Sequence, residues 1–125
     1  GLDPSTHIAV GQALEPLRYE GVLIIGSGMS YHNMQGFMSG SPEVESTSKK
    51  FDNWLAAAVE AKNPEQRIQT LVKWAEAPGA LESHPRSEHL VPLFVVAGAA
   101  GCDAGKQTYS GKLMNATISG FTFGE

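Results

Sequence analysis

Apolar residues at helical spacing predict several helices. A broken stripe over residues 4–14 predicts a first helix, with Asp3 as its N-cap and Pro4 in its first turn, where a missing N–H costs nothing. A clearer stripe begins at Phe51, with further apolar residues three, four, seven and eight positions later, and predicts one amphipathic helix face. The chain therefore opens with a helix and carries a second one near its middle.

Two further helices are predicted downstream. Asn63 is placed to cap a helix that begins at Pro64 and ends before Pro78. A strongly apolar run after a polar turn predicts a buried helix over residues 87–99, with Pro92 disturbing its first turns.

Strand patterns lie near both ends. Residues 22–26, VLIIG, are apolar, rich in β-branched side chains and bounded by glycine, which favours a strand buried on both faces. Residues 108–124 contain alternating β-formers and predict a terminal strand. Residues 27–50 show neither period and predict a long loop. Helices combined with such strands indicate an α/β fold.

Composition narrows the classes of partner. The 125 residues carry a net charge of −4, with nine scattered Lys and Arg, so no basic surface for nucleic acid or anionic lipid is expected. The single cysteine, Cys102, cannot form an internal disulfide, and neither a signal peptide nor a membrane-spanning run is visible, which favours a cytoplasmic location. The chain starts GLDPST without Met, which raises the expectation of a fragment or a removed tag.

Two nucleotide-binding patterns match only in part. GSGMSY follows a predicted strand, but Tyr31 stands where a dinucleotide-binding loop needs its third glycine. GCDAGKQT has one residue too few between its glycines and has Gln107 where a phosphate loop needs a hydroxyl. Neither pattern is retained as a prediction.

The string GMSYH, residues 28–32, resembles a nucleophile elbow. Ser30 would then be the nucleophile of a hydrolase, with Glu45 as the acid and His84 or His89 as the base. The fifth position of this turn should be small, and His32 is large. A serine hydrolase stays open as a minor alternative.

The histidines differ in their sequence surroundings. His7 and His84 are expected to be ordinary hydrogen-bonded residues. His32 follows a predicted buried strand, at the edge where α/β sheets gather ligands, and His89 lies where a polar turn enters an apolar helix. Their neighbours Asn33 and Glu88 could orient a ring or complete a metal shell.

The spacing of these residues does not indicate a self-contained metal site. A stable divalent site needs about three protein ligands, and neither a His-x-x-x-His nor a CxxC pair is present. The sequence thus predicts part of a site.

Four blocks of sequence together resemble one family. LDPSTHIAVGQALEPLR, VLIIGSGMSYHNM, HPRSEHLVPLFVVAGAAG and GFTFG, in that order, are similar to the carboxy-terminal half of class III extradiol ring-cleavage dioxygenases. This is the LigB-type superfamily, and the likeness is to its 4,5-DOPA dioxygenase branch. The resemblance implies an α/β unit over residues 1–125 with a partial mixed sheet and flanking helices. It also implies a non-haem Fe(II) cofactor, with zinc as a substitute, and a catecholic substrate that reacts with O2.

The same resemblance implies roles for individual residues. His32 would be the acid–base residue that takes a catechol proton, and His89 would be a metal ligand. His7, Asn33 and Glu88 would lie around the substrate or the ligands, with the role of His7 less defined.

Family members are much longer, and their other iron ligands are histidines of the amino-terminal half. We therefore expect a truncated chain that binds iron weakly, is inactive alone, and either self-associates or requires the missing half. The alternative from a different class is a non-enzymatic binding module of the Memo type.

Overall fold

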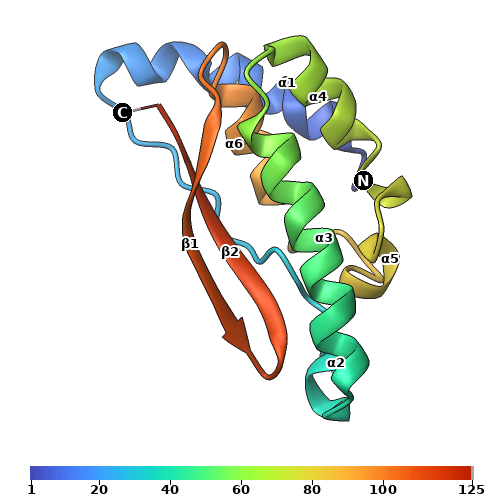
Figure 1. The fold of residues 1–125 in the computed structure, drawn as a ribbon. Coiled ribbons are helices and arrows are strands. Elements are labelled where there is room, and N and C mark those ends of the chain that lie inside the picture. Colours follow the sequence, from blue (N-terminus) through green and yellow to red (C-terminus); the bar gives the residue numbers. More distant parts are fainter. Residues whose placement is uncertain (125) are drawn as a thin grey trace.

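The computed structural model describes residues 1–124, in which one β-hairpin lies on one side of a group of helices (Figure 1). The α-helices are α1 (Pro4–Leu14), α2 (Met34–Ser39), α3 (Pro42–Glu60), α4 (Pro64–Val72), α5 (Ala80–Ser83) and α6 (Val91–Ala99). Short 3₁₀ helices are η1 (Glu15–Glu20) and η2 (Trp74–Glu76), and the strands are β1 (Gly105–Leu113) and β2 (Ala116–Phe123).

Helices α1 and α6 cross in close contact because glycines lie at the crossing. A Cβ at Gly11 would lie 1.9 Å from the carbonyl oxygen of Val95, and a Cβ at Gly98 would lie 2.1 Å from that of Ile8. Neither glycine can therefore carry a side chain in this packing.

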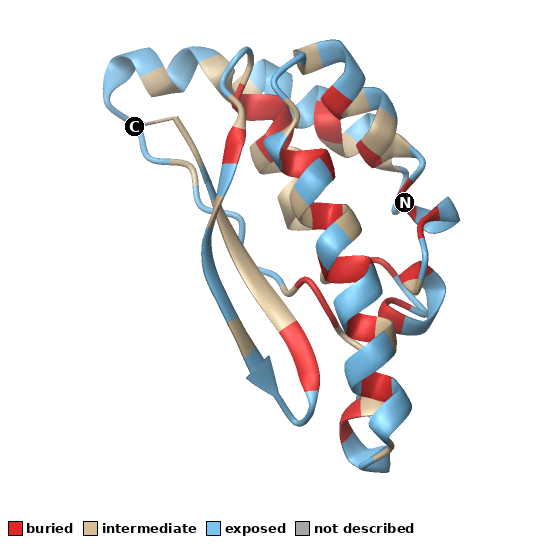
Figure 2. Ribbon diagram, viewed as in Figure 1, coloured by how far each residue is buried: buried red, intermediate tan, exposed pale blue. Residues whose placement is uncertain are grey.

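The main core lies between these two helices, α3 and α4. It is centred on fully buried apolar side chains, and Figure 2 shows the buried residues on the inward faces of the helices. The members with at most 1% exposure are Phe51, Leu55, Val59, Leu71, Ala80, Leu90 and Phe94. Burial of such side chains is the main favourable term in folding.

The hairpin lies against α3 and pairs its strands in an antiparallel ladder from Gly105–Phe123 to Leu113–Ala116, with an irregularity between Gln107 and Tyr109. A two-residue turn joins the strands, and its residues Met114 and Asn115 have φ values of 48° and 70°. Positive φ at both central residues is typical of a type I′ turn. A second, smaller apolar cluster lies where the hairpin meets α2 and α3; it contains Tyr31, Phe37, Val44 and Ala116.

Several predicted elements are confirmed. The first helix spans residues 4–14, and Asp3 caps it by accepting a hydrogen bond from the N–H of Thr6 at 3.1 Å. Asn63 likewise caps α4 by accepting from the N–H of Gln66 at 3.0 Å. The α/β class is confirmed as well.

Other predicted elements are corrected. Residues 22–26 form no strand, because no described strand pairs with them, and Leu23 and Ile25 remain 81% and 77% exposed. The expected loop over residues 27–50 contains α2 and most of the first half of α3. The N-cap Ser41, followed by Pro42, starts α3 well before its apolar stripe begins.

The carboxy-terminal region also differs from the prediction. The buried helix begins at Val91 rather than Ser87, since Pro92 fits only the first turn of a helix. The expected terminal strand is the hairpin of β1 and β2, and the sheet of the described residues is antiparallel rather than mixed. Among residues 1–124, no helix combines the length and the apolar character needed to cross a bilayer.

Candidate functional site

The structure brings His32 and His89 together. Their rings are stacked, with centroids 3.5 Å apart and planes inclined by 11°. His32 precedes Asn33, the N-cap of α2, whereas His89 lies in the turn that leads into α6. Two residues that are far apart in the sequence thus form one imidazole pair, as expected if both belong to a single site.

Hydrogen bonds from the region of α5 hold the segment that carries His32. The N–H of His32 donates to the carbonyl oxygen of Ser83 at 2.9 Å, and Nε2 of His84 donates to the carbonyl oxygen of Ser30 at 2.9 Å. Asn33 uses both ends of its amide, since Oδ1 accepts from the N–H of Gly36 and Nδ2 donates to the carbonyl oxygen of Glu82. The backbone around His32 is therefore fixed on both sides.

His84 is a buried, structural histidine. It is fully buried and packs edge-to-face against Phe51 and Trp74. Burial lowers the pKa of His84 to about 4, with smaller contributions from the nearby rings of His32 and His89. The ring is thus neutral at physiological pH, with its proton on Nε2, where it donates to Ser30.

His89 combines an exposed edge with a buried, unpartnered nitrogen. Its side chain is 40% exposed, yet Nδ1 is buried and has no hydrogen-bond partner among the described residues. The nearest carboxylate oxygen, from Glu88, lies 3.9 Å from Nδ1, beyond hydrogen-bond distance. Nδ1 is therefore unsatisfied among the described residues, and a ligand could reach this ring only through its exposed part.

The donors present do not complete a metal site. Within residues 1–124, no group of three His, Cys, Asp or Glu side chains lies close enough to hold a metal ion. The stacked pair offers imidazole, a suitable donor for Fe(II) or zinc, but a divalent site needs about three ligands. The described residues would therefore supply only some of the ligands of such a site.

The remaining predicted residues lie in different surroundings. Nδ1 of His7 donates to the carbonyl oxygen of Asp3 at 2.7 Å within α1, so His7 is tied to its own helix. The carboxylate of Glu45 pairs with Lys112 on the exposed surface rather than with a histidine. Its pKa is lowered by the hydrogen bond from Lys112.

Ser30 lies deeper than a nucleophile would. It is 7% exposed, and its Oγ accepts a hydrogen bond from the N–H of Ser119 at 2.8 Å. His84 binds the backbone carbonyl of Ser30, so this contact does not activate the hydroxyl. The arrangement supports a structural role in joining the histidine segment to β2.

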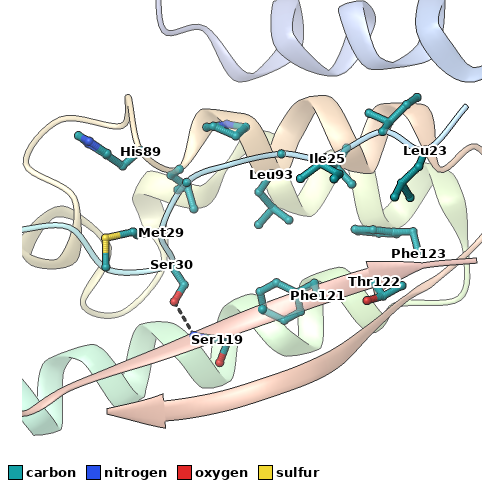
Figure 3. A pocket seen from close by; sticks show the side chains of 17 residues that line it. Leu23, Ile25, Met29, Ser30, His89, Leu93, Ser119, Phe121, Thr122 and Phe123 are labelled. Atoms are coloured by element: carbon teal, nitrogen blue, oxygen red, sulfur yellow. Dashed lines mark hydrogen bonds between the residues drawn. The ribbon is translucent and has the colours of Figure 1, made fainter. Parts of the chain in front are cut away.

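A groove opens beside the stacked pair, between residues 23–30 and β2 (Figure 3). Its volume is about 350 Å³. Mostly apolar side chains line it, including Leu23, Ile25, Leu93, Phe121 and Phe123. His89 lies at one end of this lining, and its ring points away from the groove (Figure 3).

A polar network joins α3 to the hairpin, and no local sequence pattern predicts it. Ser119 Oγ donates to the buried carboxylate of Asp52 at 2.6 Å and accepts from Gln107 Nε2 at 2.7 Å. The participants lie on α3, β1 and β2, and only the folded hairpin brings them together. The network fixes the strand from which Ser119 also reaches Ser30.

Comparisons with known proteins identify relatives along almost the whole chain. The sequence profile described as the catalytic LigB subunit of aromatic ring-opening dioxygenase matches residues 1–122. A 4,5-DOPA dioxygenase extradiol of Beta vulgaris is 42% identical over 100 residues, which cover 80% of this chain and 36% of the relative. A protein of Hapsidospora irregularis named as a dioxygenase is 33% identical, over 98% of this chain and 40% of that protein.

A solved structure shares the fold. The crystal structure of an uncharacterized protein from Escherichia coli K12 superposes with a TM-score of 0.75 at 22% identity, covering 94% of this chain and 49% of that chain. The chain therefore spans about half the length of this structure and less of the curated relatives described above.

Proposed function

Because the chain belongs to the family of the catalytic LigB subunit of aromatic ring-opening dioxygenase, we propose that it carries the proton-transfer part of an extradiol site. The observation that supports this most directly is the stacking of His32 on His89 beside an apolar groove. The substrate class we propose is a catechol, with O2 as the second substrate.

His32 is proposed as the acid–base residue. Imidazole suits this role because it accepts and donates protons near neutral pH. The hydrogen bond from His32 N–H to Ser83, together with the cap that Asn33 makes on α2, fixes the backbone from which the ring projects. A rigid backbone keeps a base within reach of a substrate hydroxyl, where it accepts the proton of that hydroxyl.

His89 is proposed as one metal ligand. Its partly exposed imidazole suits this role, and the cofactor would be one non-haem Fe(II), with zinc as a substitute. Glu88 and Asn33 lie beside the two rings in sequence and are proposed to orient them or the substrate. The remaining metal donors would come from outside the described residues.

Binding of 4-nitrocatechol in the presence of zinc tests this proposal, because the visible spectrum of this catechol changes when a hydroxyl loses its proton. The experiment uses a Cys102→Ser background, since Cys102 is an exposed thiol that could bind zinc by itself. We expect a weak deprotonated band that depends on both the chain and zinc. His32→Ala should remove the band at unchanged zinc affinity, whereas His89→Ala should weaken zinc binding itself.

Tyr19→Ala serves as the matched control, since Tyr19 is an exposed ring, 80% accessible, on η1. It should leave both readings unchanged. Equal spectra for the His32→Ala variant and its parent would contradict the acid–base assignment. Equal zinc affinity for the His89→Ala variant and its parent would contradict the ligand assignment.

A further inference from the structure

Two stretches of backbone form the walls of the groove between residues 23–30 and β2, and the first wall has no paired N–H group from residue 23 to residue 28 among the described residues. The segment is anchored only at its ends, where the N–H of Val22 donates to Leu17 and the N–H of Met29 donates to His89. Between these anchors it lies along α6, as Figure 3 shows.

Residues 23–28 pack closely on α6, but their backbone makes no hydrogen bond to this helix. A Cβ at Gly26 would lie 2.7 Å from the carbonyl oxygen of Pro92, and one at Gly28 would lie 2.2 Å from that of His89. The absence of a side chain at these two positions therefore allows the segment to pack closely against α6 and the turn before it. The segment's unpaired N–H groups still need a hydrogen-bond partner, which water supplies only while the groove stays open.

The second wall is the edge of β2 that faces away from β1. The N–H groups of Thr117 and Ser119 point away from β1, because they donate to the hydroxyls of Ser48 and Ser30. Alternation along a strand directs the N–H of Phe121 to the same side. Its cross-strand partner supports this orientation, since the N–H of Gln107 donates outward to Glu60.

An occupant of this groove must match both walls. It needs donors and acceptors along both of its edges and apolar side chains to cover Leu23, Leu93 and Phe121. A β-strand has this combination, and strand addition to an open edge is a common mode of recognition.

We propose that the groove accepts a β-strand from the part of the family fold that lies outside these 125 residues. The matched crystal structure supports this source, because it aligns with 94% of this chain but has half of its own length left over. A second copy of the chain fits less well, since its residues 23–28 would be packed on its own α6 and its β2 held by its own α3. A free segment has neither restriction.

Peptides provide the test. Overlapping synthetic peptides are drawn from the half of the Escherichia coli protein that this chain does not match, and each is added to the full 125-residue chain. Hydrogen exchange then locates any binding. We expect one or more apolar peptides to slow the exchange of the amides of residues 23–28, which have no hydrogen-bond partner among the described residues, and of Phe121, whose N–H we infer to point away from β1.

Leu23→Asp is the informative variant, because Leu23 lines the groove and is 81% exposed, so the change leaves the folded core intact. It should weaken peptide binding by roughly tenfold or more, since docking would bury a carboxylate. Leu81→Asp is the matched control, at an exposed leucine of α5 that does not line the groove, and should bind as the parent does.

Three results would overturn the proposal. The first is that no peptide binds up to its solubility limit. The second is protection of amides away from residues 23–28 and β2. The third is a stable dimer by light scattering that protects these amides without any peptide, which would identify a second copy as the occupant. None of these results depends on metal binding or on 4-nitrocatechol, so they are separate from the test of the proposed function.

Discussion

A single buried histidine, His84, makes the stability of this protein depend on pH. Burial lowers the pKa of His84 to about 4, below the value of about 6.5 for histidine in an unfolded chain. Between these values the unfolded state binds more protons, so the free energy of unfolding falls as the pH falls. This contribution is fully present above about pH 6.5 and is lost progressively down to about pH 4.

We expect the free energy of unfolding to drop by roughly 2 kcal/mol between about pH 7 and pH 5, as measured by urea denaturation. His84→Gln keeps a donor for the carbonyl of Ser30 but does not titrate, so its stability should be lower at pH 7 and nearly constant over this range. A variant that shows the same pH dependence as the parent would exclude His84 as the cause.

Some residues of the candidate site could be predicted from the sequence, and others could not. The resemblance pointed to His32 and His89, and the structure places these two rings together, although their roles remain proposals. The ordinary character of His84 was also predicted, and its burial and hydrogen bond agree. The network of Asp52, Ser119 and Gln107 was not predicted, because Asp52 and Ser119 are 67 positions apart in the sequence and so form no local pattern.

At the scale of elements, the crossing of α1 and α6 depends on the absence of side chains. Gly11→Ala should raise the intrinsic helix propensity of α1 by about 1 kcal/mol. The new Cβ would, however, lie 1.9 Å from the carbonyl oxygen of Val95, so the helices would have to separate. We expect a net loss of roughly 2 kcal/mol in the free energy of unfolding, measured by chemical denaturation.

Val10→Ala is the control for this prediction. Val10 is 47% exposed on the same helix, and alanine there improves helix propensity without a new contact. It should leave stability unchanged or slightly increased. A stabilised Gly11→Ala variant would show that the two helices can move apart at little cost.

Elements were predicted where the signal is local and missed where it depends on a partner. Caps and stripes identified α1 and α4 because Asp3 and Asn63 act within one helical turn. Residues 22–26 have the composition of a buried strand, but a strand requires a neighbour that the described chain does not offer. The hairpin turn was not predicted, because Met114 and Asn115 include no glycine, the residue that is typical of this type of turn.

At the scale of the whole molecule, we predict that the chain by itself does not catalyse turnover of a catechol. The described residues contain no group of three metal donors, and a weakly held ion spends little time in place. We expect no catechol-dependent oxygen uptake by the purified chain supplied with Fe(II), as recorded by an oxygen electrode. Sustained uptake that disappears in the His89→Ala variant would mean that the chain is a complete enzyme.

The hairpin follows every described helix in the sequence, and three side chains near the middle of the fold accept hydrogen bonds from it. Ser48 Oγ, Ser30 Oγ and the Asp52 carboxylate all accept hydrogen bonds from residues 117–119. While a ribosome still holds these residues, the earlier part of the chain can form its helices but cannot satisfy those oxygens. The hydrogen bond that ties Ser30 to β2 can therefore form only after residues 117–119 have left the ribosome, which is later than the emergence of the segment that carries His32.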